Sequence, residues 1–435
     1  MKSTATVYLL FFFFSLFLRH INTSSSISIS SSSSSLSVVP KEAFPTRSGY
    51  LPVSPATGSA IFYAFYEAQT PTSPLSQTPL LLWLQGGPGC SSMLGNFLEV
   101  GPWRVTHRPN TTQQQLALEP NLGSWNRIFG IVFLDNPIGT GLSFVVTNDE
   151  IPRNQSSVAK HLFAAINGFI DSDPLFKNRP IYVTGESYAG KYIPSIGYHI
   201  LKQNKRVPVS KREKLHGVAI GNGLTDPVSQ VAVHALNAYF IGLINGRQRV
   251  ELEKAQRKAI RLVKMGSWSK ATNARNGVLN LLQNTTGLAE LFDFTRKDPY
   301  ATSLVTSLLR MDEVKKAFGA KDTITFDVCS NVFMKALHED LMKSVKFMVE
   351  DGVASTESWM NTLKWEGIES FLMAERKAWR VKQALAGYVQ KFGNLSNAVV
   401  LGAGHLMPAD QPLISQTMIE DWVLDKGLFA NRKEN

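Results

Sequence analysis

One serine of this 435-residue chain has the setting of a catalytic nucleophile. Residues 185–190 (GESYAG) place Ser187 between small residues, directly after the short apolar run 181–184 (IYVT) and before a plausible helix. This context is typical of a nucleophile elbow, the sharp strand-to-helix turn that exposes a serine hydroxyl. We therefore expect Ser187 to be a nucleophile; the structural alternative is a serine in an ordinary tight turn.

A glycine-rich loop can supply the hydrogen-bond donors that such a nucleophile needs. Residues 85–90 (QGGPGC) follow the apolar run 80–84 (LLLWL). Glycines at a strand end let backbone N–H groups approach a ligand closely, so this loop can provide one donor to an oxyanion while the N–H of Tyr188 provides the other. Alone the motif is only a loop, but together with the elbow it predicts an oxyanion hole.

One of the eight histidines has the setting of the matching base. His405 follows the apolar run 398–401 (AVVL) and the glycines of residues 402–404. The order serine then histidine is that of the α/β-hydrolases, in which an acid lies between the two. The pattern places His405 at the carboxyl end of the sheet, where open parallel sheets keep their sites.

The elements that must position these residues alternate between strands and helices. Strands are expected at 59–67, 80–84, 131–134, 181–184, 217–220 and 398–401, and a crossover helix at 158–170. This alternation predicts an α/β-hydrolase fold, with a mostly parallel central sheet and helices on both faces. The charged segment of about 245–320 contains no convincing strand and is expected to be a helical cap insertion.

The amino terminus resembles a targeting segment. Lys2 precedes an apolar run at residues 7–18, a length that fits the core of a signal peptide and is short for a membrane span. We expect residues 1–23 to be a signal peptide, with a short membrane anchor as the alternative, residues 24–42 a Ser-rich linker, and residues 43–435 the folded domain. A secreted protein is therefore expected, outside the cell or in the vacuole, without stable membrane insertion.

Secretion also predicts glycans and a disulfide. Four acceptor sequons begin at Asn110, Asn154, Asn284 and Asn394. The chain has two cysteines, Cys90 and Cys329, which can form one bridge in an oxidising compartment or remain two buried thiols. The net charge of +11 is spread without a long basic run, so a nucleic-acid partner is not expected. No metal-ligand spacing or phosphate-binding loop is present, and no cofactor is implied.

Four motifs in the same order resemble the serine carboxypeptidase family, especially its plant serine carboxypeptidase-like members. They are WLQGGPGCSS (83–92), GESYAGKYIP (185–194), GNGLTDP (221–227) and GAGHLMP (402–408). The resemblance covers nearly the whole chain after residue 45. It implies that Ser187 is the nucleophile, His405 the base, and Gly87 and Tyr188 the oxyanion donors. It also implies that Cys90 is bridged to a cysteine near the end of the cap, which fits Cys329.

The resemblance further implies a site for the free carboxylate at the C-terminus of a peptide or protein substrate. Its members would be Gln85, Gly86, Glu99 and Glu186. An amide and backbone N–H groups donate to a carboxylate, whereas a glutamate does so only when it is protonated, so activity at acid pH is expected. Gln85 stands where the family's peptidases have asparagine, and its extra methylene can displace the amide.

The chain departs from the family at the acid that should complete the catalytic triad with Ser187 and His405. The family carries it at the end of a buried strand, in a stretch resembling L-L-Y-x-G-x-x-D-x-R followed by D-G. Here residues 338–350 lead directly to Asp351 and Gly352, so that about fifteen residues are missing by comparison, the acid among them. Residues 337–348 read as a helix with one apolar face, or Val345, Phe347 and Val349 alternate as a strand that delivers Asp351 as a substitute acid.

Three functions remain after this comparison. The first is a secreted serine carboxypeptidase acting through an acyl-enzyme on Ser187, with activity impaired by the missing acid, as in a truncated product or a pseudoenzyme. The second is a serine carboxypeptidase-like acyltransferase that uses the same catalytic group. The third is a catalytically silent secreted binding protein. The serine pair after Cys90, together with Glu99 and Glu186, favours the peptidase over the acyltransferase.

Overall fold

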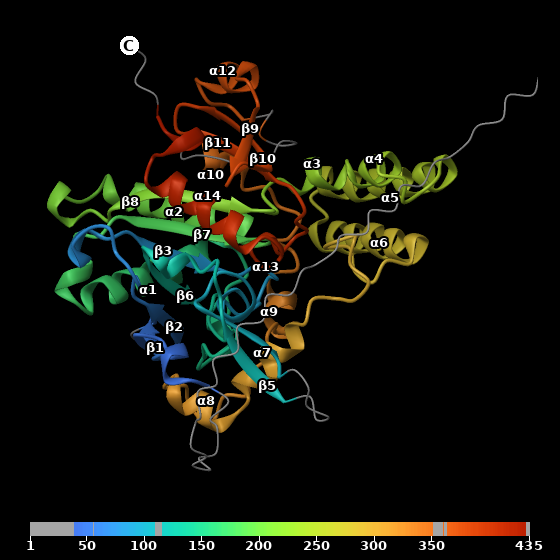
Figure 1. The fold of residues 1–435 in the computed structure, drawn as a ribbon. Helices are drawn as coiled ribbons and strands as arrows, with labels where there is room; N and C mark the ends of the chain where they lie inside the picture. The colour runs from blue at the N-terminus through green and yellow to red at the C-terminus, as the bar shows by residue number, and fades with distance from the viewer. Residues whose placement is uncertain (1–38, 55, 109–114, 351–359, 361–362, 432–435) are drawn as a thin grey trace, which may run out of the picture. The chain divides into compact units, whose positions relative to one another are not determined.

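A six-stranded mixed sheet forms the centre of the molecule (Figure 1). The computed structural model describes residues 39–54, 56–108, 115–350, 360 and 363–431. Within these residues the strand order is β1-β2-β6-β3-β7-β8. The strands are β1 (Arg47–Pro52), β2 (Ala60–Tyr66), β3 (Leu80–Leu84), β6 (Gly130–Leu134), β7 (Ile181–Glu186) and β8 (Leu215–Gly221). The predicted signal peptide and most of the predicted linker lie outside the described residues.

The central strands are short apolar runs because they are covered on both faces. β6, β3, β7 and β8 are parallel, whereas β1 and β2 join the sheet in antiparallel pairs. Along β3, Leu80, Leu82 and Leu84 enter one hydrophobic cluster while Leu81 and Trp83 enter another, as the alternation of side chains in a strand requires. The predicted α/β-hydrolase fold is confirmed.

Helices cover both faces of this sheet. α1 (Gln155–Asp171) and α2 (Ala189–Asn204) bury their apolar side chains in the first cluster, and α14 (Pro412–Val423) contributes to the second. The remaining α-helices within the described residues are α3 (Pro227–Val231), α4 (His234–Phe240), α5 (Gly246–Lys264), α6 (Trp268–Thr286), α7 (Thr302–Leu309), α8 (Asp312–Ala317), α9 (Asn331–Ala336), α10 (Lys346–Glu350), α12 (Ile368–Met373) and α13 (Met407–Asp410). The segment expected to be a cap contains α5 to α8.

Two smaller antiparallel sheets accompany the main sheet in the part of the chain that the structure describes. One pairs β4 (Trp103–His107) with β5 (Leu116–Pro120), and the other has the order β11-β10-β9, with β9 (Lys377–Val381), β10 (Ala384–Phe392) and β11 (Leu395–Val400). The strand before His405 was expected in the main sheet, and that expectation is wrong. β11 pairs with β10, and within the described residues no strand joins β11 to β8.

The structure also differs from expectation at the start of the domain and at residues 337–349. The ordered domain begins before residue 43, because Val39 is already buried in the second hydrophobic cluster. The strand reading of residues 345–349 is wrong, since α10 is helical there and leaves Phe347 exposed. The helical reading holds for α10, but turns separate it from α9, so the helix is not continuous from Leu337. Asp351 lies outside the described residues.

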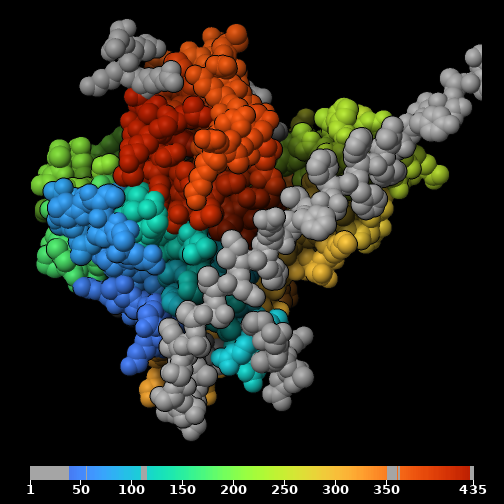
Figure 2. All heavy atoms as spheres, in the orientation of Figure 1, coloured from blue at the N-terminus to red at the C-terminus, as the bar shows by residue number. Residues whose placement is uncertain are grey.

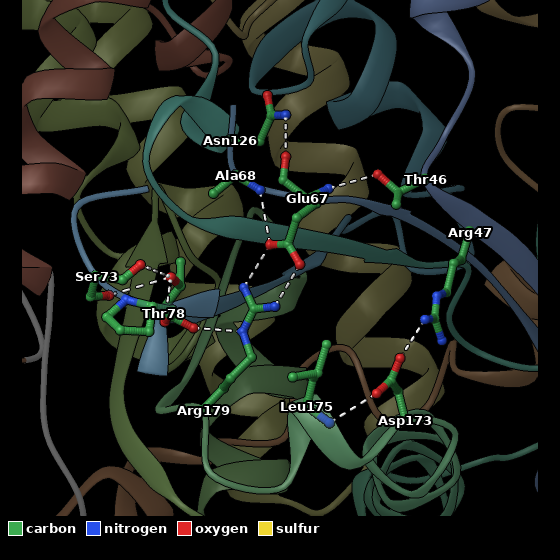
Figure 3. A network of polar contacts seen from close by, with 11 residues as sticks. Thr46, Arg47, Glu67, Ala68, Ser73, Thr78, Asn126, Asp173, Leu175 and Arg179 are labelled. Carbon is green, nitrogen blue, oxygen red and sulfur yellow. Dashed lines mark hydrogen bonds and ion pairs between the residues drawn. The ribbon is translucent and has the colours of Figure 1, made fainter. Parts of the chain in front are cut away.

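A buried ion pair fixes the amino ends of the central strands (Figure 3). The guanidinium of Arg179 donates to both carboxylate oxygens of Glu67, at 2.7 and 2.8 Å, and to the carbonyl of Thr78 at 2.6 Å. The Arg179 side chain is fully buried. Because the bidentate contact joins the end of β2 to the segments that precede β3 and β7, it sets the positions at which these strands begin.

Replacing Glu67 by alanine is expected to lower the free energy of unfolding by about 3 kcal/mol, because it leaves the Arg179 charge buried without its partner. The matched control is Asp327→Ala, which removes the exposed ion pair with Arg310 and is expected to cost less than about 1 kcal/mol. Urea denaturation of both variants measures the difference. Equal losses would contradict the assigned role of the buried pair.

Candidate active site

The turn after β7 holds Ser187 in a conformation that few non-glycine residues adopt. Its φ is 60°, in the left-handed region. Three backbone hydrogen bonds maintain the turn: Ser187 N–H donates to the Gly221 carbonyl at 3.0 Å, while the Ser187 carbonyl accepts from Gly190 and Leu224 at 2.9 and 2.8 Å. Strain of this kind persists only where the surroundings impose it, and it is common at active sites. The hydroxyl-bearing residue itself is partly exposed.

The loop after β3 packs directly against this turn. A Cβ atom added to Gly86 would lie 2.5 Å from the Tyr188 amide nitrogen and 2.7 Å from the Ser187 Cβ, so only glycine fits there. Gly87 has φ +111°, again a conformation that favours glycine. Neither the Gly87 nor the Tyr188 N–H donates to an acceptor within the described part of the chain. The two predicted oxyanion donors therefore belong to backbone segments in contact, and both are available to a ligand.

A buried carboxylate that sequence reasoning missed anchors the glycine-rich loop. Asp135, at the end of β6, accepts hydrogen bonds from the Ser91 hydroxyl at 2.6 Å and from the Ser92 and Leu142 amides at 2.8 Å. Burial raises its pKa to about 6, although these donors oppose the shift. Its position immediately after the apolar run 130–134 was the available signal. The Cys90–Cys329 disulfide ties the same loop to the segment before α9, so the free-thiol alternative is wrong.

Three of the predicted carboxylate-binding side chains meet beside the elbow. The Gln85 amide donates to Glu186 at 2.8 Å and its oxygen accepts from the Trp83 indole at 2.9 Å. Glu99 is completely buried at the end of η3 (Gly95–Glu99), and its carboxylate lies beside Glu186 and Gln85 but forms no hydrogen bond of ordinary geometry with the described residues. Burial raises the pKa of Glu99 to about 7; burial and then the adjacent Glu99 charge raise that of Glu186 well above its usual range. The pair is therefore protonated at acid pH.

His405 reaches the same region through backbone contacts. Its carbonyl accepts from the Asn222 amide at 2.8 Å, one residue after the Gly221 that bonds Ser187, and its N–H donates to the Phe292 carbonyl at 2.8 Å. The ring stacks on Phe292 with centroids 4.8 Å apart. Its buried Nε2 atom has no partner, and no carboxylate hydrogen-bonds the ring, within the residues that the structure describes. Burial lowers the His405 pKa to about 4, so the imidazole is neutral at pH 5 and above.

Another buried carboxylate positions the side chain that follows the serine. Asp340 accepts from the Tyr188 hydroxyl at 2.9 Å and from the Gln155 amide at 2.7 Å. The Lys191 ammonium lies 3.7 Å from the same carboxylate and donates to the Asp340 carbonyl at 2.7 Å. Burial lowers the Lys191 pKa to about 8. This network joins α1, α2 and the turn after α9, and no sequence motif linked these elements.

Arg104 and Asp410 hold the segment that follows His405. Arg104 donates to the carbonyls of Glu99, Pro408 and Ala409. Asp410 accepts from the Gly404 N–H at 2.8 Å and from the Tyr300 hydroxyl at 2.6 Å. These contacts connect the histidine loop to the end of η3 and to the segment before α7. Asp410 is thus a structural acid near the site that does not contact the imidazole.

The predicted modification sites differ in their surroundings. Asn154 caps α1 by accepting from the Ser157 N–H at 3.0 Å, Asn284 is exposed in α6, and Asn394 is exposed in the turn between β10 and β11. Asn110 lies outside the described residues. No helix among the residues placed by the structure is long and apolar enough to cross a membrane, and those residues form no cluster suited to a metal ion.

Comparison with known proteins yields consistent matches. The family model described as serine carboxypeptidase matches residues 38–425. "Serine carboxypeptidase-like 50" of Arabidopsis thaliana is 52% identical over 412 residues, which cover 90% of each chain. "Probable serine carboxypeptidase CPVL" of Homo sapiens is 31% identical, covering 87% of this chain and 83% of that protein. The structure of the Saccharomyces cerevisiae prohormone-processing carboxypeptidase Kex1 aligns with a TM-score of 0.76 at 25% identity, over 89% of this chain and 93% of that one.

Glu99→Gln is expected to change how stability depends on pH. The raised pKa means that the folded state of the wild type binds the Glu99 proton more tightly than the unfolded state does. The contribution of this proton to the free energy of unfolding is fully present below about pH 4.5 and is lost as the pH rises through about 7. From pH 5 to pH 8 the variant should gain on the order of 2 kcal/mol relative to the wild type. Glu251→Gln, on the exposed face of α5, is the control. Parallel stability curves for wild type and Glu99→Gln would contradict the buried, protonated assignment.

Proposed function

Because the chain belongs to the serine carboxypeptidase family, we propose that it is a secreted carboxypeptidase-like hydrolase with Ser187 as nucleophile and His405 as base. The observation that carries the proposal is the contact between Gly86 and the Ser187–Tyr188 turn, which leaves two amides free beside a strained serine. In the proposed reaction the Ser187 oxygen attacks the scissile carbonyl, His405 takes its proton and later donates it to the leaving amine, and water releases the acyl group. Gly87 and Tyr188 N–H groups would hold the oxyanion.

Substrate selection in this proposal rests on the buried acids. Protonated Glu99 and Glu186, with Gln85 and the Gly86 amide, would donate hydrogen bonds to the C-terminal carboxylate of a peptide. The raised pKa values support this role, as does the lack of a hydrogen bond of ordinary geometry to Glu99 within the described residues. A free carboxylate is the feature that distinguishes a carboxypeptidase substrate, so this cluster favours peptidase over acyltransferase chemistry.

We also propose that catalysis is slow, because the ring of His405 has no acidic partner within the described residues. Such a partner orients the imidazole and stabilises its charged form, and in the serine-protease case its replacement by asparagine lowers kcat by about 10⁴. Burial already disfavours the charged form of His405. Secretion is supported by the disulfide, which persists in oxidising compartments.

A fluorophosphonate probe is expected to label the wild type slowly and Ser187→Ala not at all, because only an activated serine attacks the phosphorus. Ser195→Ala, which removes a buried serine of α2, should retain labelling and is the matched control. Gel fluorescence of folded samples measures the rates. Equal labelling of wild type and Ser187→Ala, or none in either, would contradict the proposal and favour a silent binding protein.

The kcat/KM for an N-blocked dipeptide with a free carboxylate is expected to fall at least about tenfold from pH 5 to pH 8, mainly through KM, as the glutamate pair ionises and repels the substrate. His405 does not cause this fall, because its pKa of about 4 leaves the base neutral across the range. The same dipeptide capped as an amide is the control and should show no such loss. A flat profile for the free acid would contradict the assignment of Glu99 and Glu186.

A further inference from the structure

The helices α5 and α6 carry much of the protein's positive charge. From Gly246 to Thr286 the chain has nine basic and two acidic side chains, a net charge of +7 out of the +11 of the whole chain. No acidic residue occurs between Glu253 and Glu290, a span that contains seven basic ones. Figure 2 shows atoms of these two helices, coloured yellow-green to yellow, at the surface of the molecule. The excess of one sign is therefore concentrated in a single helical pair.

The helical period places part of this charge on one face of α5. Four exposed basic residues follow one another at intervals of three or four positions, so their side chains lie along one side of the helix. The members of this α5 basic row are Lys254, Lys258, Arg261 and Lys264. The opposite face, with the buried residues Leu252 and Ala259, packs against α4 and α6. The basic row therefore points away from the rest of the cap.

Solvation alone does not account for the α5 basic row, because acidic side chains solvate a helix face equally well. Like charges three or four residues apart destabilise a helix, whereas opposite charges stabilise it, as Arg249 and Glu253 do in the first half of α5. No side chain of the row forms an ion pair or a hydrogen bond with the described residues. The helix dipole favours cations in the last turn, which explains Arg261 and Lys264 only.

We infer that the α5 basic row binds a linear acidic polysaccharide, a sugar chain with one carboxylate on each ring. The row is one helix wide and about 15 Å long from Lys254 to Lys264, which fits an extended chain better than a flat membrane surface. The apolar face of α5 packs on α6 and is not available for insertion into a bilayer. α5 also has no aromatic side chain on which the bases of a nucleic acid could stack.

The spacing of the row supports this partner. Successive members lie about 5 Å apart along the helix axis, similar to the length of one sugar ring in an extended chain, so each cation can meet one carboxylate. Clusters of Lys and Arg of this kind are typical of surfaces that bind polyanions. The choice of a polysaccharide rests on the proposed secretion, which brings the protein to polymers outside the cell. Binding there would attach the protein through a segment that contains none of the proposed catalytic residues.

The experiment uses the full chain and a fluorescein-labelled oligogalacturonate of about ten sugars, which is longer than the row. Fluorescence anisotropy at about pH 6, where the sugar carboxylates are ionised, should show saturable binding that added salt weakens. A variant with glutamine at all four positions of the row should bind at least about tenfold more weakly, because it loses four charge contacts and keeps the helix propensity. The methyl-esterified oligomer, which lacks the negative charges, is the control ligand and should not bind.

A control variant separates the position of the charges from their number. It replaces four exposed basic residues of the same types by glutamine, Lys202, Lys205, Arg206 and Lys211, and so has the same net charge as the first variant. It should weaken binding less than about twofold, because distant exposed charges are screened by salt. Equal losses in the two variants would overturn the inference. So would a lack of saturable binding, or tighter binding to a single-stranded oligodeoxynucleotide or to phosphatidylserine vesicles.

Lysine acetylation tests the same inference in the wild type, in case the first variant does not fold. At a concentration that saturates the protein, the oligogalacturonate should slow acetylation of Lys254, Lys258 and Lys264 at least about fivefold, as measured by mass spectrometry. Lys202 and Lys205 should react at an unchanged rate. Equal protection of both groups, or protection of neither, would overturn the inference. Neither readout uses catalytic activity, so failure here is separate from failure of the proposed hydrolase function.

Discussion

The close contact of two backbones, at Gly86 and at the Ser187–Tyr188 turn, is the constraint on which the site depends. A side chain at residue 86 would overlap the Tyr188 amide, so the loop after β3 and the turn after β7 can meet only through a glycine. β3 and β7 are parallel neighbours, which brings their carboxyl ends to the same edge of the sheet. The sheet supplies the proximity, and the absence of one Cβ allows the final approach.

Several buried acids lie around this contact, and the surroundings of each acid indicate what it does. Asp135 accepts three hydrogen bonds and anchors the glycine-rich loop, while Asp340 is held by Tyr188, Gln155 and Lys191 and fixes the turn. Glu99 forms no hydrogen bond of ordinary geometry with the described residues, and desolvation keeps it neutral at acid pH. Asp135 and Asp340 thus hold backbone segments together, whereas burial raises the pKa values of Glu99 and Glu186, so that this pair is protonated at acid pH.

The sequence predicted the elements whose signals are local. Buried runs such as 80–84 and 130–134 became strands, and the small residues around Ser187 predicted its turn because few other types tolerate that geometry. Asp135, Asp340 and Arg104 were missed because their roles come from contacts between segments distant in the chain. The placement of β11 in the main sheet failed for a related reason: an apolar strand pattern specifies burial, but not which strand lies beside it.

Within the described residues no strand joins β11 to β8, and this changes how His405 is positioned. If a strand lay between them, a continuous hydrogen-bond ladder would connect the histidine loop to the elbow through the sheet. Within the described residues, His405 is instead held by loop contacts: Asn222 binds its carbonyl, Phe292 receives its N–H, and Asp410 binds the preceding amide. Loop contacts of this kind break more readily than a sheet ladder, because each can open without disturbing the others. The nucleophile and the oxyanion donors thus follow directly on strands of the main sheet, whereas the base depends on contacts between loops.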